Sequence, residues 1–550
     1  MATTRRRSAA RAPRADRTPS SSFRDELVAL HREIYRRNQR RIQAAVSDDD
    51  RAFAAYEARY RRSLPRLQRV AEFDEIVTRS RAADVVLVGD YHTLEQSQRS
   101  VVRLLRQLLP STRPLALALE FVEGSHQDAL DAFLRGRLGE KSFLRRISFK
   151  QHWPYGSFDG LRSICELART HRVTGLAIDR DAGRGASLEA RDRYAATRIA
   201  AWLAKNPTGQ VLCLIGELHL APAHLPAALR SRGCTRLVTL HQNCEQVYHA
   251  LEARGLEQEA EAVLLARDRY ALNVVPPVIC QQSFLRWLDE DDRYHDVATL
   301  REAFVDQAQL IAHLLELDAR EALTGVQVET LADLSFMHRL RRSKVFSTDE
   351  WQALREQILN SESYYIPRLK LVYLGTPSVN HSSEEAAHFL RDALAGESSP
   401  RHAIEAFYDR AVNEALAFFG SKLVNHKRKA LHESAFRRML REAREDPTLY
   451  SKPELQRAQL VLGHKRLEQG GRAPLDASLF SASPVVLDAV AHALGYMLGD
   501  RLYYAVVRGE MPKAEARAAF VEPLRGRGAA INAYFMLSAR LAGVRVPRRA

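Results

Sequence analysis

Between residues 85 and 240, short runs of apolar residues alternate with longer amphipathic stretches. The apolar runs are Val85–Val88, Leu115–Leu119, Val173–Ile178, Val211–Ile215 and Leu237–Leu240. The amphipathic stretches between them are Leu94–Leu109, Ser125–Leu134, Phe158–Thr170, Leu188–Ala204 and Ala223–Arg230. This alternation predicts βαβ units and a mainly parallel sheet. Because the runs are almost continuously apolar, we expect helices to cover both faces of the sheet.

The flanking segments carry a different pattern. A sixth and more polar run, Ala262–Val274, predicts an edge strand, and helical spacing dominates before the first run and from about Phe284 onward. We therefore predict an α/β fold, with a mainly parallel sheet flanked by helices, followed by an all-α helical domain. The expected parts are a disordered basic tail over residues 1–22, an N-terminal helical segment over 23–80, the α/β domain over 81–290, a helical region over 291–396 and a C-terminal helical domain over 401–550.

Two sequence signals mark helix starts in the second half of the chain. Ser382 with Glu385 has the spacing of a capping box. Ser483 followed by Pro484 also indicates a helix start, because proline is favoured in the first helical turn. The stretch after it, Val485–Leu498, is apolar on nearly all sides and predicts the core helix of a bundle.

Composition narrows the class of protein. Of 550 residues, 46% are hydrophobic and 27% are charged, values that exclude a mostly disordered chain. No run approaches the roughly 18 apolar residues of a membrane span. The five cysteines form no CxxC pair, which favours a reducing, cytoplasmic location over a disulfide framework or a cysteine–zinc site.

The first 22 residues carry six arginines and no apolar stretch behind them. This composition argues against a secretory signal, although a transit peptide would share it. We expect a disordered tail whose deletion leaves the melting temperature unchanged.

The net charge of +15 raises the question of an acidic partner such as nucleic acid. However, the basic residues are mostly arginine, 71 against 11 lysines, and acidic residues are interspersed with them after residue 22. We interpret the positive charge as a general feature of the chain's composition. We therefore expect a small-molecule ligand rather than nucleic acid. A homodimer remains open.

The common phosphate-binding, zinc-protease and serine-hydrolase motifs are absent from the sequence. Candidate site residues are therefore identified by their positions relative to the predicted strands. Polar side chains come directly after four of the predicted strands: Asp90 and His92, then Glu120, then Asp179 and Arg180, then Glu217 and His219. Ligands of open parallel sheets bind outside the carboxyl ends of the strands, so we expect these residues to meet at one edge. Two histidines with several carboxylates suit either a metal ion or a water-activating pair.

Two of these turns share the form GxxH, in Gly89-Asp90-Tyr91-His92 and Gly216-Glu217-Leu218-His219. We expect each glycine to allow a tight turn off its strand. An acidic residue after a strand often only caps the next helix. Capping does not need histidine, so the repeated GxxH favours a functional site.

These residues carry a resemblance to a known family. Gly89-x-x-His92, Glu120 and Gly216-x-x-His219 resemble the ChaN-like family, in the superfamily of the Tiki and TraB proteins and the erythromycin esterases. Trp153-Pro154, Asp179-Arg180 and Arg191-Asp192 add to the likeness, which runs from about Asp84 to about Asp289. The chain departs from the family pattern in three ways: Asp90 stands where the family usually has Glu, a lipoprotein signal is lacking, and the helical second half is not covered.

The resemblance implies an α/β domain with its site at the sheet edge. It implies haem binding and iron uptake in the ChaN branch, and metal-dependent peptidase or ester-hydrolase activity in the relatives. It assigns the catalytic or metal-ligating roles to His92, Glu120 and His219. The ligand-binding residues beside them are expected to be Asp90, Tyr91, Asp179, Arg180 and Glu217.

Three hypotheses follow. The first, which we favour, is a protein that binds haem, or iron in another form. The second is a metal-dependent hydrolase in which a bound divalent ion lowers the pKa of a water molecule and Glu120 or a histidine takes the proton. The third is an interaction protein that keeps only a vestigial site.

Two further sets of residues are weaker candidates. Tyr91, Tyr155 and Tyr194 lie in the right segment to ligate a haem iron as tyrosinate, although buried tyrosines with hydrogen-bonded hydroxyls are commoner. Glu385-x-x-His388 has the spacing found in di-iron helical bundles. Those bundles need two such pairs, so we interpret this one as a solvated helix face.

Overall fold

The computed structural model describes most of the chain. The described residues are 22–45, 51–110, 112–154, 158–180, 187–289, 297–330, 335–342, 345–348, 351–352, 354–355, 363–374, 378–396, 402–447, 449–470 and 477–547. The predicted basic tail, apart from Ser22, lies outside these residues, as does Tyr155.

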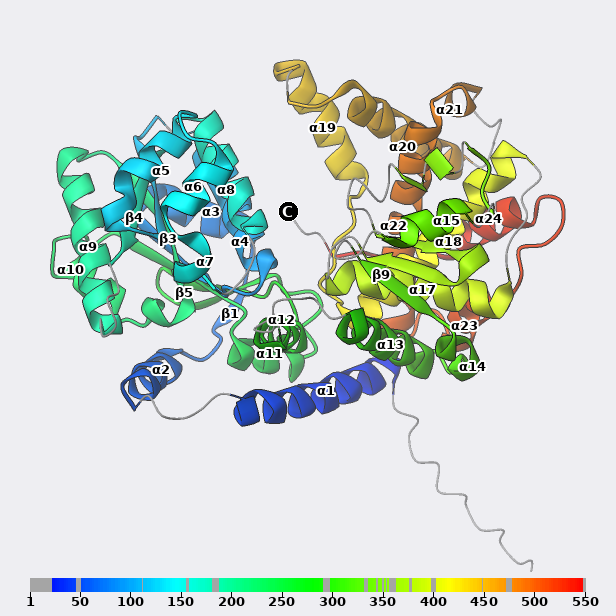
Figure 1. Cartoon of the computed structure of the whole chain (residues 1–550), viewed down its shortest axis with the longest axis horizontal. Coiled ribbons are helices and arrows are strands. Elements are labelled where there is room, and N and C mark those ends of the chain that lie inside the picture. The colour runs from blue at the N-terminus through cyan, green and yellow to red at the C-terminus, as the bar shows by residue number, and fades with distance from the viewer. Residues whose placement is uncertain are drawn as a thin grey trace, which may run out of the picture.

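An eight-stranded sheet forms the centre of the amino-terminal half of the molecule (Figure 1). Its strands are β1 (Arg69–Ala71), β2 (Val85–Asp90), β3 (Leu115–Glu123), β4 (Thr174–Asp179), β5 (Gln210–Gly216), β6 (Leu237–Gln242), β7 (Ala262–Ala266) and β8 (Arg269–Leu272). The spatial order is β1-β7-β8-β6-β2-β5-β3-β4. All neighbours from β8 to β4 pair in parallel, and only β1–β7 and β7–β8 are antiparallel. The predicted fold class is confirmed.

Helices cover both faces of this sheet. The helices of this half are α2 (Arg51–Ser63), α3 (Phe73–Ala82), α4 (Glu95–Leu108), α5 (Gln127–Leu134), α6 (Glu140–Arg146), α7 (Phe149–His152), α8 (Asp159–Thr170), α9 (Leu188–Lys205), α10 (Leu225–Arg230), α11 (Glu245–Glu252) and α12 (Pro277–Asp289). Of these, α12 packs in the core of the helical half. Successive side chains of a strand point to opposite faces. Accordingly, Val86 and Val88 of β2 pack in the core under α4 and α8, whereas Val85 and Leu87 pack in the core under α9 and α10. All four are fully buried.

Two parts of the amino-terminal half differ from what the sequence pattern predicted. Strand β1 and helix α3 fall within the segment expected to be an N-terminal helical extension, but β1 pairs with β7 at the edge of the sheet. A strand of three residues is too short to show an alternating pattern. The run Ala262–Val274, expected to be one edge strand, forms the antiparallel pair β7 and β8, with Asp268 in the left-handed conformation at the turn.

The helical half, residues 297–547, is built around one central helix, α18 (Ala403–Val424), which packs most extensively against three others (Figure 1). These are α17 (Val379–Ala395), α22 (Pro484–Val507) and α24 (Ala529–Arg540). The remaining helices are α13 (Val297–Leu314), α14 (Arg320–Thr324), α15 (Ser335–Arg342), α19 (Glu433–Glu445), α20 (Lys452–Gly470), α21 (Ala477–Phe480) and α23 (Lys513–Val521). A three-stranded sheet of β9 (Gln327–Thr330), β10 (Tyr364–Ile366) and β11 (Leu371–Leu374) is added to the predicted helices.

Helix α1 (Phe23–Ala45) runs beneath both halves and packs against α12 and α22 (Figure 1). Its His31 is buried and contacts the carbonyl oxygen of Leu423 at 3.2 Å through Nε2. Charged contacts join the halves elsewhere, since Lys427 Nζ donates to the carbonyl oxygen of Ala260 at 2.8 Å. Among the described residues, no helix is both long enough and apolar enough to cross a membrane.

Candidate functional site

The predicted polar residues gather at the carboxyl ends of β2, β3, β4 and β5, which are neighbours in the sheet. Asp90 is the last residue of β2, and His219 lies in a short 3-10 turn directly after β5. Glu120 does not end β3, as the sequence pattern suggested, because the strand continues to Glu123. Between Leu119 and Glu123 the pairing of β3 with β4 shifts register. Such an irregularity redirects a side chain out of the regular ladder.

Glu120 is the hub of the cluster and is buried. One carboxylate oxygen, Oε2, accepts the backbone N–H of Gly216 at 2.5 Å. The other, Oε1, lies 2.6 Å from the Arg191 guanidinium and 3.5 Å from His219 Nε2. Burial alone would raise the pKa of Glu120, but Arg191 and His219 hold it far below its usual range. Glu120 is therefore ionised and ion-paired.

His219 is buried between two carboxylates. Its Nδ1 lies 2.7 Å from Asp192 Oδ1 and 3.0 Å from the hydroxyl of Tyr56, which itself donates to Asp192 at 2.8 Å. Burial would lower the pKa of His219, but the hydrogen bonds with Asp192 and Glu120 raise it to about 9. His219 is consequently an imidazolium at neutral pH.

His92 occupies a more accessible position. Asp90 Oδ2 lies 2.9 Å from His92 Nδ1, and the ring of Trp153 packs at 4.3 Å between centroids. A Cβ at Gly216 would lie 3.2 Å from His92 Nε2 and 3.5 Å from Glu120 Oε2, so these two groups face each other across the glycine. Burial opposes protonation of His92, but Asp90 outweighs it and raises the pKa of the imidazole.

The glycines of the two GxxH segments do not have the expected role, which was to allow a tight turn after each strand. Neither has a positive φ, and Gly216 is at φ −49° and ψ 139°. A Cβ at Gly89 would lie 1.7 Å from Glu217 Oε2, and one at Gly216 would touch the His92 ring. The glycines are thus required because polar side chains approach the backbone closely, not because the chain turns sharply.

Comparisons with known proteins show what part of the chain resembles. Residues 76–187 match the family described as haem-binding uptake, Tiki superfamily, ChaN. The chain contains a ChaN-like domain. A solved structure described as cofacial heme binding to ChaN of Campylobacter jejuni is similar at 14% sequence identity, with a TM-score of 0.27, over 32% of this chain and 87% of that chain. No curated protein matches the chain.

We apply the name ChaN-like domain to residues 69–289, the sheet with the helices between its strands. The family match itself includes His92 and Glu120 and ends before His219. Helix α2, which precedes the domain, contributes to its site through Tyr56 and Tyr60.

The remaining predicted residues of the ChaN-like domain are dispersed. Asp179 belongs to the cluster, because its carboxylate accepts Arg191 Nε at 2.7 Å, whereas Arg180 is exposed. Tyr91 turns away and packs against the core that contains Cys280. Tyr194 lies with its hydroxyl against Gly124.

Glu217 faces a different set of partners. Its carboxylate accepts the Tyr60 hydroxyl at 2.5 Å and the backbone N–H of Gln242 at 3.0 Å, and His241 Nδ1 lies 2.7 Å away. Cys244 completes this second group, with its sulfur 3.7 Å from the same carboxylate. Glu217 therefore does not join Glu120, although its sequence position suggested that it would.

Metal-binding geometry is found in two places among the described residues. Potential ligand atoms lie within 4.8 Å of one another in the groups Glu217–His241–Cys244 and Glu384–Glu414–His492. The predicted ligand set, His92 with Glu120 and His219, is not one of these groups. Burial holds the pKa of the Cys244 thiol well above its usual value, which opposes the thiolate that a metal would need.

The sequence pattern missed the residues that hold the site together. Tyr56 and Tyr60 come from α2, and Asp192 and Arg191 come from the first turns of α9. Two local signals were present: the one-turn spacing of the two tyrosines on an otherwise charged helix, and the Arg191-Asp192 pair, which the sequence pointed to only through the family likeness.

Proposed function

We propose that the ChaN-like domain binds haem at the carboxyl edge of its sheet, with His92 as the ligand of the iron. The family match to haem-binding uptake proteins supports the ligand class. The observation that carries the proposal is the Asp90–His92 pair. A histidine that ligates a metal usually has its other ring nitrogen fixed by a carboxylate, and Asp90 does this for His92 at 2.9 Å. Histidine is a common axial ligand of haem iron.

The predicted site residues His92, Glu120 and His219 are not equally suited to ligate the haem iron. His92 keeps 23% of its side chain exposed, against 5% for His219. His219 is protonated at neutral pH, since its pKa is raised to about 9, and an imidazolium has no lone pair to donate. Glu120 is fully engaged by Arg191 and Gly216. These two residues therefore order the site beside His92.

The surroundings of His92 suit a flat, apolar ligand with acidic groups. The Trp153 ring packs against the His92 ring, and the centroid of the Phe121 ring lies 6.3 Å from that of Trp153. These rings form an aromatic wall beside His92. Arg180, exposed after β4, supplies a positive charge for the propionate groups of haem. Haem would bring redox-active iron to this edge, and the protein would supply the ligand, the wall and the charge.

The hydrolase hypothesis receives less support from the same contacts. A general base works best when its pKa lies near the operating pH. Glu120 is held far below that range by Arg191, and His219 is already protonated. Neither of these two groups is poised to take a proton from a water molecule, which leaves His92 as the base of that hypothesis.

The test is a haem titration of the full chain followed through the Soret band. Wild type is expected to give a saturable shift, and His92→Ala is expected to weaken binding by at least about tenfold. His171→Ala is the matched control, because His171 is exposed at the end of α8 in the same domain. Wild-type affinity in His92→Ala would refute the assignment. The absence of any Soret shift in wild type would refute haem binding; if the protein also retained no metal at this edge and cleaved no ester or peptide, the interaction-protein hypothesis would remain.

A further inference from the structure

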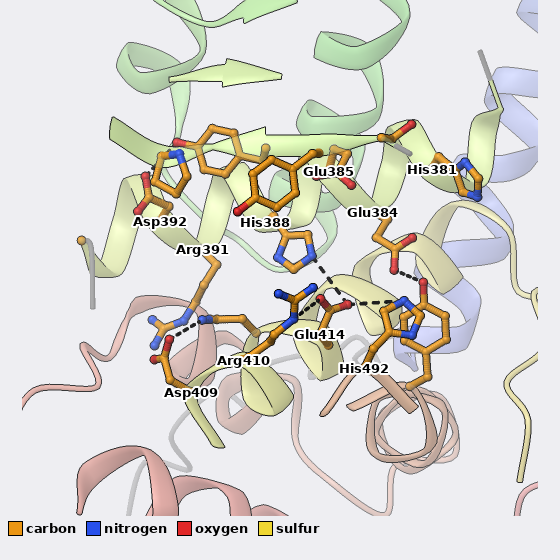
Figure 2. Close-up of a pocket in the computed structure, with 17 residues that line it drawn as sticks. His381, Glu384, Glu385, His388, Arg391, Asp392, Asp409, Arg410, Glu414 and His492 are labelled. Atoms are coloured by element: carbon orange, nitrogen blue, oxygen red, sulfur yellow. Dashed lines mark hydrogen bonds and ion pairs between the residues drawn. The ribbon is translucent and has the colours of Figure 1, made fainter. Parts of the chain in front are cut away.

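A second cluster of histidines and carboxylates lies in the helical half, around a cavity of about 540 Å³ (Figure 2). The cavity is lined by α17, α18 and α22 together with β10. None of its lining residues belongs to the ChaN-like domain. The cluster therefore has no part in the function proposed for that domain.

Three helices deliver the polar side chains. Helix α17 contributes Glu384, Glu385 and His388, helix α18 contributes Glu414, and helix α22 contributes His492. The approach of α22 to α18 depends on glycine. A Cβ at Gly495 would lie 2.5 Å from the Cβ of Glu414, and one at Gly499 would lie 2.3 Å from the carbonyl oxygen of Ala415. The close packing sets His492, one turn before Gly495, beside Glu414.

The sequence pattern misplaced the Glu385-x-x-His388 pair. Helix α17 begins at Val379 after Ser378, so Ser382 lies inside the helix and does not form the expected capping box with Glu385. Nor is the pair on a solvated face, because Glu385 is only 7% exposed and both residues line the cavity. Residues three apart share one face of a helix, which directs both side chains to the same place.

Glu414 is the centre of the cluster, as Figure 2 shows. The residue is 7% exposed, and its carboxylate has no hydrogen-bond partner among the described residues. Its Oε2 lies 3.9 Å from His388 Nε2 and 3.8 Å from His492 Nε2, while Oε1 lies 3.7 Å from Arg410 Nε. Two imidazole nitrogens thus converge on one carboxylate oxygen and stop short of hydrogen-bonding distance.

This spacing is what a shared metal ion requires. Nitrogen and oxygen ligands lie about 2.0–2.2 Å from a transition metal, so two ligands of one ion are separated by about 3–4 Å. The separation of 3.8 Å between Glu414 Oε2 and His492 Nε2 falls within that range. Glu384 also offers an oxygen within 4.8 Å of the Glu414 and His492 ligand atoms.

The charge of the cavity also favours a cation. Glu384 is balanced by Arg428 at 2.7 Å and by the hydroxyl of Tyr496. Glu385 and Glu414 add two more buried carboxylates to the same cavity, and Arg410 Nε approaches Glu414 Oε1 only to 3.7 Å. Burying several carboxylates is costly when counter-charges are few, and a bound cation would reduce that cost.

We propose that the helical half binds one divalent transition-metal ion between α17, α18 and α22, with Glu384, Glu414 and His492 as ligands and His388, 3.9 Å from Glu414, beside them. Mixed imidazole and carboxylate donors select zinc, iron or manganese over calcium and magnesium, which prefer oxygen alone. The chain offers one Glu-x-x-His pair on α17, and a di-iron centre in a helical bundle would use two. The site is accordingly mononuclear.

The first test is metal analysis of the full chain. After incubation with Zn²⁺ or Mn²⁺ and gel filtration, wild type is expected to retain about one equivalent, measured by inductively coupled plasma mass spectrometry. Loss of a direct ligand should weaken binding by more than about 100-fold, since even the loss of a supporting partner costs 10–100-fold. Glu414→Gln, which keeps the side-chain shape, and His492→Ala should therefore retain no metal.

Two controls make the result specific. His402→Ala removes an exposed histidine of the same half and should retain the metal. His92→Ala should retain it as well, so that failure of haem binding and failure of this site are distinguished. Circular dichroism checks that each variant is folded, and EDTA should lower the melting temperature of wild type but not of Glu414→Gln.

Two outcomes would overturn the proposal. One is a wild-type protein that retains neither ion and shows no change in melting temperature when Zn²⁺, Mn²⁺ or EDTA is added. The other is a folded Glu414→Gln variant that retains as much metal as wild type, which would move the ion to another group such as Glu217, His241 and Cys244.

Discussion

Substitution of Gly89 by alanine is expected to destabilise the ChaN-like domain strongly. The new methyl group would lie 1.7 Å from Glu217 Oε2 and 2.8 Å from its Cδ, so the carboxylate must rotate away. The Tyr60 hydroxyl at 2.5 Å and the Gln242 N–H at 3.0 Å then lose their acceptor. Each buried polar group left unpaired costs about 1–3 kcal/mol, and the gain from replacing glycine is only about 0.4–1 kcal/mol. For the two groups together, the net loss is about 1–5.5 kcal/mol.

Urea unfolding of the full chain measures this loss, with Gly463→Ala as the matched control. Gly463 lies inside α20, nothing stands within 4 Å of an added Cβ there, and alanine should stabilise by up to about 1 kcal/mol. Gly216→Ala is an intermediate case, because its methyl group would only press on the His92 ring at 3.2 Å. Its stability loss should be smaller, and its haem affinity should fall. A Gly89→Ala protein as stable as wild type would refute the role assigned to the glycine.

Two further predictions concern buried charges. The pKa of His219 is raised from 6.5 to about 9 in the folded state, so its stabilising contribution is fully present below pH 6.5 and is lost as the pH rises through 9. Asp192→Asn should therefore reduce the free energy of unfolding clearly at pH 6 and much less at pH 10; an equal loss at both values would contradict this. Lys422 is buried and ion-paired with Asp500, and Lys422→Met should cost about 3–5 kcal/mol because it leaves the carboxylate without its main counter-charge. The double variant Lys422→Met/Asp500→Asn should recover part of that loss in thermal unfolding, and no recovery would argue against the pairing.

The strands could be predicted from the sequence because parallel sheets have a simple signature. Each of the five apolar runs, from Val85–Val88 to Leu237–Leu240, lies within or overlaps one strand of the sheet. The rule that ligands bind at the carboxyl ends of strands then located His92 and Glu120 without any structure. The rule needs only the position of a residue relative to the end of its own strand, which the sequence pattern provides.

The partners of these residues could not be predicted in the same way. Tyr56 contacts Asp192 across 136 positions of sequence, and only the packing of α2 on the end of the sheet brings them together. The same limitation explains the error at Glu385 and His388. A polar residue on a helix has the same pattern whether it faces water or a cavity between helices, and only the arrangement of α17, α18 and α22 distinguishes the two.

The position of α1 has a consequence for how the protein is made. The helix is synthesised well before one of its partners, because His31 contacts the carbonyl oxygen of Leu423, 392 residues later. At about 5–20 residues per second, α1 waits roughly 20–80 s before that partner has been synthesised. During this interval Leu27, which is buried in the finished protein, lacks the α18 and α22 part of its core. The contacts of α1 with α12 can form once residue 289 has been made, but its docking is completed only by the helical half, so nascent chains stalled before residue 423 should leave α1 less protected from proteases than the finished protein.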